Sequence, residues 1–426
     1  MVDERTAARF SGKRVHIVGL GRFGGQVALA RYLRVHGARL VISDTRDEPD
    51  LAPSISALGG LENIELALGD SLPAADSAQF DFIAPSPAVP PGNAHLKSAT
   101  EAGVETVTEI GLFIERCPAA ITAVTGSAGK STITALTAAM HEASGQRVHF
   151  GGNIGRSLLE ELDGIDPDDI LVLELSSFQL DRLPDGFPPF RVAVLACLFE
   201  HHLDWHGSYE AYVRAKQRIF LGQVEGRDLT LRDAIPVASS ATRLRGLIMR
   251  RNCALAATAA RFRSATEAGI DAAMAAFPGL PHRFEEVARL ETERGSVVFV
   301  NASKATCPRT AAAALAVADP PIFAILGGAA FPPGAEEEVD PMLWAVSQSQ
   351  AQALIGPATA LLAPALPEAE HAADLEDAVE RMGAAALAAG SGTVILAPGF
   401  PSYDAFVNYE ERGEVFRRAA RELVKT

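Results

Sequence analysis

Residues 120–132 read AITAVTGSAGKST, and this stretch decides the fold of the middle of the chain. Ala120–Thr125 is an apolar, β-branched run that predicts a buried strand, and a helical pattern begins at Ser131. The glycines between them predict a short loop whose successive backbone N–H groups surround an anion. Lys130 would add a positive charge for phosphate, and the Ser131 hydroxyl would bind Mg²⁺. This pattern favours a site that binds the phosphates of ATP. The alternative is a solvated lysine at the start of a helix, without a ligand.

A second glycine stretch, GLGRFG at residues 19–24, follows the predicted strand Arg14–Val18 and precedes the predicted helix Gln26–Val35. Asp44 lies 20 residues beyond Gly24, at the end of the next predicted strand. Glycines in such a turn let the backbone approach a phosphate, and the acid can accept hydrogen bonds from a hydroxylated group. By itself, this pattern is compatible with a nicotinamide dinucleotide, with a nucleotide-sugar diphosphate and with no ligand at all.

Strand-like and helix-like segments alternate along the chain in three series, which predicts α/β architecture with parallel sheets. The series are separated near Glu109 and Pro281. Further strands are predicted at 39–43, 80–84, 170–175, 191–195, 297–301, 322–326, 353–355 and 393–397. The glycine- and proline-rich stretch 327–334 is expected to be a loop that leaves a strand.

Composition narrows the class of protein. The 426 residues are 48% hydrophobic and 21% charged, which predicts a globular protein and excludes wholesale disorder. The formal charge of −15 disfavours a nucleic-acid partner, which usually requires a basic domain. No run reaches the ~18 apolar residues of a membrane span, and the charged N-terminus does not resemble a secretory signal. Four separate cysteines without a CxxC pair indicate free thiols, so we expect a cytoplasmic protein.

Polar residues that suit a cation follow two of the predicted strands. Glu174 ends the apolar strand Ile170–Leu175, at the edge where ligands of parallel sheets bind. His202 lies in Glu200–His206, a crowd of acidic and imidazole side chains beyond the next strand. The alternative for Glu174 and for His202 is an ordinary solvated polar residue at the edge of the sheet, without a cation. Lys216 lies in a helical pattern, and nothing in its spacing distinguishes it from a solvated lysine.

Taken in order, these segments resemble the Mur ligase family, and within it the member that adds D-glutamate. The matching segments are 125–132, 151–155, 174–180, 202–208, 212–220, 280–283, 301–306 and 402–413. ELSSFQL at 174–180 and the NASKAT segment at 301–306 are the most specific of them. The resemblance extends over nearly the whole chain.

The resemblance implies a reaction and three domains. ATP would phosphorylate the carboxylate of UDP-N-acetylmuramoyl-L-alanine, and the amine of D-glutamate would attack the acyl phosphate, a step of peptidoglycan synthesis. Residues 1–108 would be a Rossmann-like domain for UDP, and residues 109–279 a shortened central ATPase-type domain. Residues 280–426 would be a second Rossmann-like domain that brings the amino acid. The family also implies a cytoplasmic enzyme with Mg²⁺ as cofactor and no membrane insertion, and we expect a monomer.

The resemblance also assigns residues to roles. ATP would contact Gly126, Ser127, Ala128, Gly129, Lys130, Ser131, Thr132, Asn252 and Arg283. The two other substrates would contact Gly19, Gly21, Asp44, Thr45, Asn153, Lys304, Thr306 and Ser402. Metal ions would be held by Ser131, Glu174, His202 and Lys216, the last as a carbamate. Lys130, His202 and Lys216 would serve catalysis.

Several positions depart from the family pattern. They are Ala128, Cys197, His201, Leu255, Ala302, Cys307 and Phe331, and the segment between Phe220 and Asn252 is short. Phe331 replaces the lysine that binds the carboxylate of the incoming amino acid in the family. These departures keep two alternatives open: a ligase for another amino acid, and a regulatory paralogue of low activity that binds a nucleotide sugar. A dehydrogenase is a third alternative, which the phosphate loop disfavours.

Overall fold

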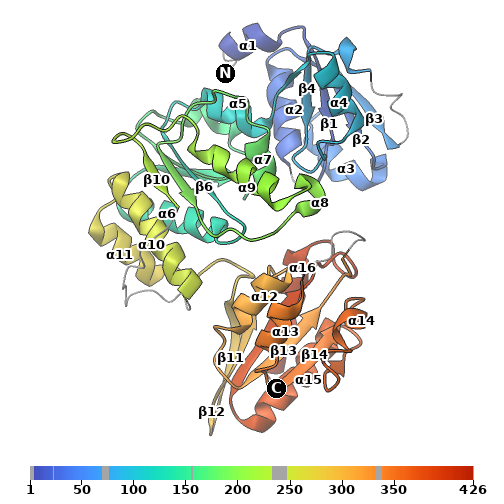
Figure 1. The fold of residues 1–426 in the computed structure, drawn as a ribbon, viewed down its shortest axis with the longest axis vertical. Helices are drawn as coiled ribbons and strands as arrows, with labels where there is room; N and C mark the ends of the chain where they lie inside the picture. Colours follow the sequence, from blue (N-terminus) through green and yellow to red (C-terminus); the bar gives the residue numbers. More distant parts are fainter. Residues whose placement is uncertain are drawn as a thin grey trace. The chain divides into compact units, whose positions relative to one another are not determined.

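The computed structural model describes residues 4–22, 24–69, 76–154, 157–232, 247–331 and 338–425. Within them, strands and helices alternate and build three separate sheets, so the predicted α/β class is confirmed (Figure 1). No helix in these ranges is both long enough and apolar enough to cross a membrane.

The first sheet has five parallel strands in the order β3-β2-β1-β4-β5. Its strands are β1 (Arg14–Val18), β2 (Arg39–Asp44), β3 (Ile64–Leu68), β4 (Phe82–Pro85) and β5 (Glu105–Thr106). Its helices are α1 (Glu4–Phe10), α2 (Gly25–Val35), α3 (Glu48–Ala57) and α4 (Ala94–Glu101). The strand order reverses direction between β1 and β4, and in parallel sheets ligands bind beyond the strand ends at such a point.

The second sheet also has five parallel strands, in the order β10-β9-β6-β8-β7. Its strands are β6 (Ile121–Thr125), β7 (Val148–Gly152), β8 (Ile170–Glu174), β9 (Val192–Leu195) and β10 (Leu229–Leu231). The helices of this part are α5 (Glu109–Arg116), α6 (Lys130–Ala143), α7 (Ser177–Asp181), α8 (Leu203–His206), α9 (Tyr209–Gln217), α10 (Leu247–Phe262) and α11 (Glu267–Ala276). The central strands β6 and β8 are buried along their whole length, as their continuous apolar runs predict.

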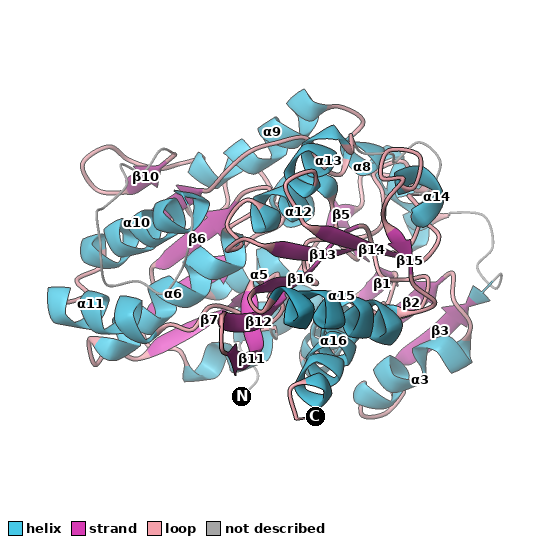
Figure 2. Ribbon diagram, turned by 90° about the horizontal axis from the view of Figure 1, so that it is seen from below, coloured by secondary structure: helices cyan, strands magenta, loops and turns pink. Residues whose placement is uncertain are grey.

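The third sheet has six strands in the order β11-β12-β16-β13-β14-β15, and only β11 runs antiparallel to its neighbour. Its strands are β11 (Glu285–Thr292), β12 (Gly295–Asn301), β13 (Ile322–Gly327), β14 (Ala351–Ile355), β15 (Glu370–His371) and β16 (Gly392–Gly399). Its helices are α12 (Pro308–Leu315), α13 (Asp340–Val346), α14 (Thr359–Leu362), α15 (Leu375–Ala389) and α16 (Tyr409–Leu423). Figure 2 shows α12 and α13 on one face and α15 and α16 on the other; alternate residues of β13 pack on each pair.

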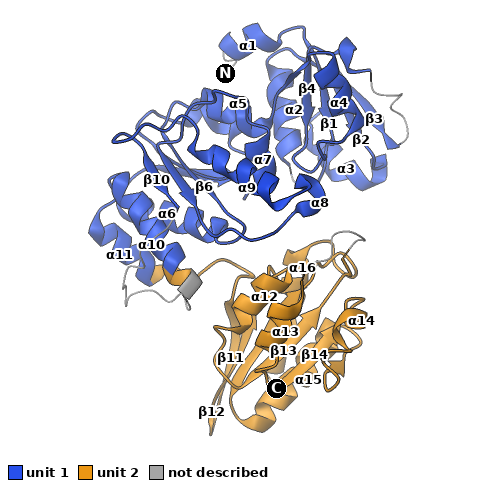
Figure 3. Cartoon of the chain, in the orientation of Figure 1, with its two compact units in different colours: residues 1–241, 251–275 blue, residues 242–250, 276–426 orange. Residues whose placement is uncertain are grey.

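The chain divides into two compact units (Figure 3). Unit 1 comprises residues 1–241 and 251–275 and contains the first two sheets. Unit 2 comprises residues 242–250 and 276–426 and contains the third sheet. The site residues expected from the sequence are therefore shared between the two units, and each unit is described by itself below.

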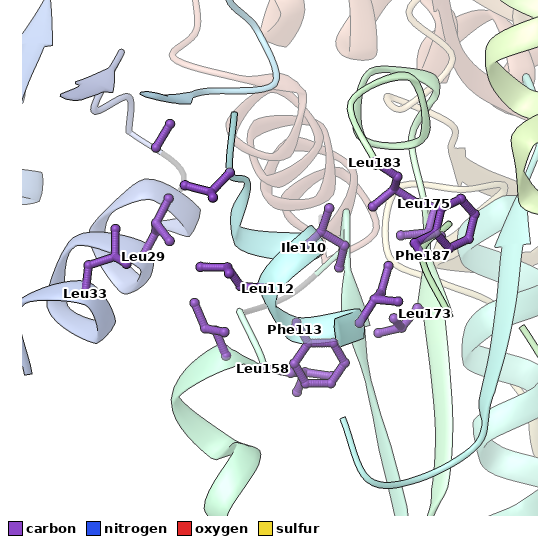
Figure 4. Packing of buried hydrophobic residues seen from close by; sticks show 14 of the residues in the cluster. Leu29, Leu33, Ile110, Leu112, Phe113, Leu158, Leu173, Leu175, Leu183 and Phe187 are labelled. Atoms are coloured by element: carbon purple, nitrogen blue, oxygen red, sulfur yellow. The ribbon is translucent and has the colours of Figure 1, made fainter. Parts of the chain in front are cut away.

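One apolar cluster joins the first two sheets within unit 1. Figure 4 shows Ile110, Leu112 and Phe113 of α5 between Leu29 and Leu33 of α2 on one side and side chains of β8 on the other. All of the residues named here are at most 3% exposed. Because the cluster is continuous, α5 packs the first sheet's helices onto the second sheet.

The predicted strands agree with the observed ones to within a few residues, and the exceptions have local causes. The strand predicted at 80–84 begins at Phe82, because residues 77–79 form a 3₁₀ turn first. No strand was predicted for β3, β5, β7, β10, β11 or β15. Strand β11, with the sequence EEVARLET, has mostly charged or half-exposed residues, as an edge strand does. The loop expected at 327–334 does leave β13, although its last three residues lie outside the described ranges.

Candidate active site

The predicted phosphate loop lies between the end of β6 and the first turn of α6. Gly126 has φ 152° and Gly129 has φ 86°, conformations that side chains disfavour. A Cβ on Gly126 would lie 2.8 Å from the Ala196 Cβ, and one on Gly129 would lie 2.7 Å from Asn252 Oδ1. The loop therefore requires glycine at both positions. Asn252, which is buried in α10, packs directly against it.

Polar contacts hold the loop in shape. Lys130 folds back, and its Nζ donates to the Gly126 carbonyl oxygen at 3.0 Å. The Ser127 hydroxyl donates to the Phe199 carbonyl oxygen at 2.9 Å and lies 2.8 Å from the Tyr212 hydroxyl. These contacts tie the loop to the segment after β9 and to α9. The arrangement leaves Lys130 positioned over the loop, where a bound phosphate would replace the carbonyl as its partner.

The helix side of the loop carries two buried hydroxyls, Ser131 and Thr132, on the first turn of α6. Ala128 pairs with Cys197 through a backbone bridge, and the Cys197 thiol donates to the Ala128 carbonyl oxygen at 3.4 Å. The methyl group of Ala128 offers no polar contact of its own. Polar contacts to a phosphate would therefore come from the backbone N–H groups, Lys130 and the two hydroxyls.

Glu174, at the end of β8, has one carboxylate oxygen with a partner and one without. Its Oε1 accepts a hydrogen bond from Asn153 Nδ2 at 2.8 Å. Its Oε2 is fully buried and has no hydrogen-bond partner among the described residues. A buried carboxylate oxygen without a partner is costly unless a ligand such as a cation uses it. Glu174 therefore fits the position of a metal ligand.

Lys216 lies on α9 and is 2% exposed. Its Nζ donates to the Gly126 carbonyl oxygen at 2.9 Å and to Thr125 Oγ1 at 3.3 Å. Burial lowers the pKa of Lys216 well below 10.5, and the nearby Lys130 charge lowers it further. A lowered pKa raises the share of the neutral amine, which is the nucleophilic form that reacts with CO₂ to give a carbamate.

His202 has a left-handed backbone, with φ 55°, at the start of α8. Burial first, and then the neighbouring His201, Lys130 and Lys216, together lower the pKa of its imidazole from 6.5 to about 2. The ring is therefore neutral at physiological pH and keeps a lone pair that can bind a cation. Its ring packs 4.8 Å from the ring of Phe178.

The donor set of this region fits a divalent cation. Within the described ranges, no group of three or more His, Cys, Asp or Glu side chains is arranged so that it could hold a metal ion by itself. A cation site here would instead combine the Ser131 hydroxyl, the free oxygen of Glu174, the neutral imidazole of His202 and a modified Lys216. Three of these four donors, from Ser131, Glu174 and a carbamate on Lys216, are oxygens, which suit Mg²⁺. Glu174 pairs in register with Val124 at the end of β6, and both Lys130 and Lys216 donate to the carbonyl oxygen of Gly126 just beyond it.

The glycine turn of the first sheet is closed by Asp44. Gly19 and Gly21 have φ of 83° and 67°, and the Gly21 N–H donates to Asp44 Oδ2 at 3.0 Å. Asp44 Oδ1 accepts from the Arg46 N–H at 3.0 Å, so both oxygens already have backbone partners. Thr45, the next residue, is exposed. The structure thus brings together Gly19, Gly21, Asp44 and Thr45 at the end of β2.

In unit 2, the segments after β12 and β16 are joined through Arg412. Its guanidinium is fully buried and donates to the carbonyl oxygens of Ser303 at 3.0 Å and Phe400 at 3.1 Å. Lys304 Nζ lies 3.6 Å from the centroid of the Tyr409 ring. The predicted residues of this unit are placed as follows: Lys304 and Thr306 in the turn after β12, Ser402 buried after β16, and Arg283 half-buried just before β11.

Phe331, at the position where the family has lysine, belongs to an apolar cluster. Its half-buried ring lies 4.9 Å from the ring of Phe400, and both pack among the side chains of α12 and α13. The side chain therefore stabilises unit 2 through packing and offers no charge to a carboxylate.

Two residues that the sequence reasoning missed connect the site in unit 1. Tyr212 is 1% exposed; its hydroxyl contacts Ser127, and its ring lies 4.8 Å from Lys216 Nζ. Phe178 packs against His202 and stacks on His206. The spacing of Tyr212 and Lys216, one helical turn apart, was the available signal for the first residue. For Phe178, no signal from spacing distinguishes it from a core aromatic.

Two models of Mur ligase domains match this chain. Residues 13–108 match the family model of the MurD-like N-terminal domain of Mur ligases. Residues 124–242, which include the phosphate loop, Glu174, His202 and Lys216, match the model of the Mur ligase middle domain.

Relatives match over nearly their whole length. The UDP-N-acetylmuramoylalanine–D-glutamate ligase of Geobacter metallireducens is 34% identical, over 97% of this chain and 98% of the relative. Its counterpart in Nitratidesulfovibrio vulgaris is 34% identical over 99% of each chain. The alignment with the Geobacter protein spans 461 positions, more than the 426 residues of this chain, so that relative has residues that this chain lacks.

Solved structures share the fold. UDP-N-acetylmuramate–alanine ligase MurC from Thermotoga maritima has a TM-score of 0.56 at 17% identity, covering 97% of this chain and 99% of MurC. MurF ligase from the same organism, solved in complex with ADP, has a TM-score of 0.53 at 17% identity, covering 99% and 97%. The relatives that match over the full length, the two domain models and the shared fold all indicate the same family. The chain therefore belongs to the Mur ligase family.

Proposed function

We propose that this protein is the ligase that joins D-glutamate to UDP-N-acetylmuramoyl-L-alanine, with hydrolysis of ATP to ADP and phosphate. Relatives at 34% identity over the whole chain carry the name of this activity. The observation that carries the proposal is the gathering of the phosphate loop, the unpartnered oxygen of Glu174 and the buried Lys216 in one region. Activation of a carboxylate by ATP requires such a combination of phosphate and cation binding.

We propose the following roles in unit 1. The backbone N–H groups of residues 126–129 and the Lys130 ammonium would bind the terminal phosphates and stabilise the charge that develops as the phosphoryl group moves. Ser131, Glu174, His202 and a carbamate on Lys216 would hold Mg²⁺, which when bound neutralises phosphate charge. The neutral form of Lys216 favours the carbamate, since the amine attacks CO₂ and loses a proton to water.

The acceptor would bind at the glycine turn of the first sheet, with Gly19, Gly21, Asp44 and Thr45 at the nucleotide. Asn153 would contact the muramoyl part of the acceptor, because it is exposed and also donates to Glu174. Asp44 already accepts from two backbone N–H groups, which suits a fixed turn that presents its remaining N–H groups to phosphate.

In unit 2, Lys304, Thr306 and Ser402 would bind the incoming amino acid, and Arg283 would contact ATP. We propose the domain ranges 1–108, 109–279 and 280–426 for the acceptor, ATP and amino-acid domains. We also propose that the protein acts in the cytoplasm, since ATP and nucleotide-linked precursors are cytoplasmic metabolites. We propose that it acts as a monomer.

One observation favours a second candidate, a ligase for a different amino acid. Phe331 packs on Phe400 and supplies no charge for the carboxylate of the incoming amino acid. The test is phosphate release by the purified protein with ATP, Mg²⁺ and UDP-N-acetylmuramoyl-L-alanine, using a panel of D- and L-amino acids. The proposal expects D-glutamate to have the highest kcat/KM. A higher value for another amino acid would support the second candidate, and no release with any of them would refute both.

A further inference from the structure

Arg182 holds a turn of the first sheet from a position in the second. It directly follows α7, the helix of the ELSSFQL segment. Both terminal nitrogens of its guanidinium donate to backbone carbonyl oxygens, Nη1 to Ser86 and Nη2 to Val89, in the turn after β4. Neither the sequence patterns nor the proposed function gives this residue a role.

The turn that Arg182 holds covers the glycine turn. A Cβ on Gly19 would lie 3.2 Å from Ser86 Cβ and 3.3 Å from Val89 Cγ2, closer than ordinary van der Waals contact, so these two side chains lie directly over the glycine. The Ser86 N–H also donates to the Val18 carbonyl oxygen at 2.8 Å. The two carbonyls bound by Arg182 therefore belong to the wall of the proposed acceptor site.

Arg182 also lies beside a row of aromatic rings that leads to His202 of the proposed cation site. The guanidinium carbon lies 5.4 Å from the centroid of the Trp205 ring. That ring lies 4.9 Å from Phe178, which lies 4.8 Å from His202. A planar guanidinium can stack on an indole and donate two parallel hydrogen bonds at the same time, which an ammonium group cannot.

We propose that Arg182 is a positioning residue that fixes the Ser86–Val89 turn of the acceptor site relative to the aromatic wall of the cation site. The proposal rests on the proposed function for the identity of the acceptor. Arg182 touches neither the reacting atoms nor, in this account, the substrate. Its effect would be on the placement of the acceptor, and the acceptor KM is therefore the quantity that it controls.

The first experiment compares steady-state kinetics of the wild type with Arg182→Gln and Arg182→Lys. The matched control is Arg218→Gln. Arg218 also donates to backbone carbonyl oxygens around α7, to Leu180 at 2.9 Å and to Leu183 at 2.6 Å. Neither of these hydrogen bonds goes to the Ser86–Val89 turn. We expect both Arg182 variants to raise the acceptor KM by roughly tenfold or more, because the paired contact is lost, and to leave the ATP KM unchanged. The control should leave both KM values unchanged.

Several results would overturn the proposal. They are an unchanged acceptor KM in Arg182→Gln, an equal rise in both KM values, and a rise of the same size in the Arg218 control. Thermal melts of all variants identify a general loss of folding, which would lower the active fraction without changing KM.

The second experiment does not depend on ligase activity. The chain has two tryptophans, and Trp344→Phe leaves Trp205 as the single fluorescent reporter beside Arg182. We expect UDP to change the Trp205 emission in this background and to lose that effect when Arg182→Gln is added, while calorimetry still detects bound UDP. A response of the same size in both proteins, or no response in the Trp344→Phe background, would contradict the proposal. If the wild type lacks ligase activity with D-glutamate, the proposed function fails while this titration still tests Arg182.

Discussion

Replacing Glu174 by glutamine separates its role as a metal ligand from any role in folding. The glutamine side chain has the same shape, and its oxygen can still accept from Asn153 Nδ2, which lies 2.8 Å from Glu174 Oε1. The amide nitrogen then takes the place of Oε2, the buried oxygen without a partner. The substitution thus removes one buried charge and keeps the hydrogen bond on the other side.

The expected magnitudes follow from this geometry. An unsatisfied buried polar group costs about 1–3 kcal/mol, and a charged one more. Without metal, Glu174→Gln should therefore unfold with an unchanged or higher free energy of unfolding, higher by up to about 3 kcal/mol. With Mg²⁺ and ATP, losing a charged contact worth about 1.5–3 kcal/mol should reduce turnover by roughly 10- to 100-fold or more.

Urea denaturation in EDTA measures the free energy of unfolding, and phosphate release across a Mg²⁺ titration measures the apparent metal affinity. The control is Asn153→Ala, which leaves Oε1 without its donor and should lower the free energy of unfolding by about 1–3 kcal/mol. If Glu174→Gln instead destabilises the metal-free protein by more than about 1 kcal/mol, Glu174 stabilises the fold itself and the reasoning is refuted.

Three further predictions concern other parts of the chain. Burial of His16 in β1 lowers its pKa in the folded state from 6.5 to about 4, so between these pH values only the unfolded chain binds the proton. Between pH 6.5 and 4, the free energy of unfolding of the wild type should therefore fall by about 3 kcal/mol more than that of His16→Phe. An equal fall in both proteins, measured by denaturant melts across this range, would contradict the prediction. Lys130→Ala should keep the UDP affinity of the wild type in calorimetry while losing phosphate release, and a parallel loss of UDP binding would show that the sites are not separate. Phe331→Lys should lower the D-glutamate KM about tenfold, equivalent to about 1.4 kcal/mol, and lower the melting temperature because its packing on Phe400 is lost; an unchanged KM would favour the ligase for another amino acid.

The sequence predicted the parts of the fold that depend on local pattern. The strand at 121–125, the loop and the helix from Lys130 form within a residue of their predicted bounds, because glycine geometry and apolar periodicity act locally. The antiparallel strand β11 was missed, since an exposed edge strand needs no continuous apolar run.

The residues of the candidate site were harder to predict from local sequence patterns than the strands and helices. Lys216 has an ordinary helical pattern, and only tertiary burial, which leaves it 2% exposed beside the loop carbonyl of Gly126, makes it unusual. The contacts of Arg182 with the Ser86–Val89 turn join segments far apart in the chain, so no spacing reveals them. The contact of Tyr212 with Ser127 also joins distant segments, and its only signal in the sequence is the spacing from Lys216. The expected roles come from the resemblance, and they stay predictions.

The most direct test of the account is to follow the oxygen of the acceptor carboxylate. UDP-N-acetylmuramoyl-L-alanine labelled with ¹⁸O in the alanine carboxylate is incubated with the protein, ATP, Mg²⁺ and D-glutamate, and the released phosphate is analysed by mass spectrometry. If the site in unit 1 phosphorylates that carboxylate, one ¹⁸O atom will be found in each phosphate released. Phosphate without label, released at the rate at which the amide forms, would contradict an acyl phosphate intermediate and with it the proposed chemistry of this site.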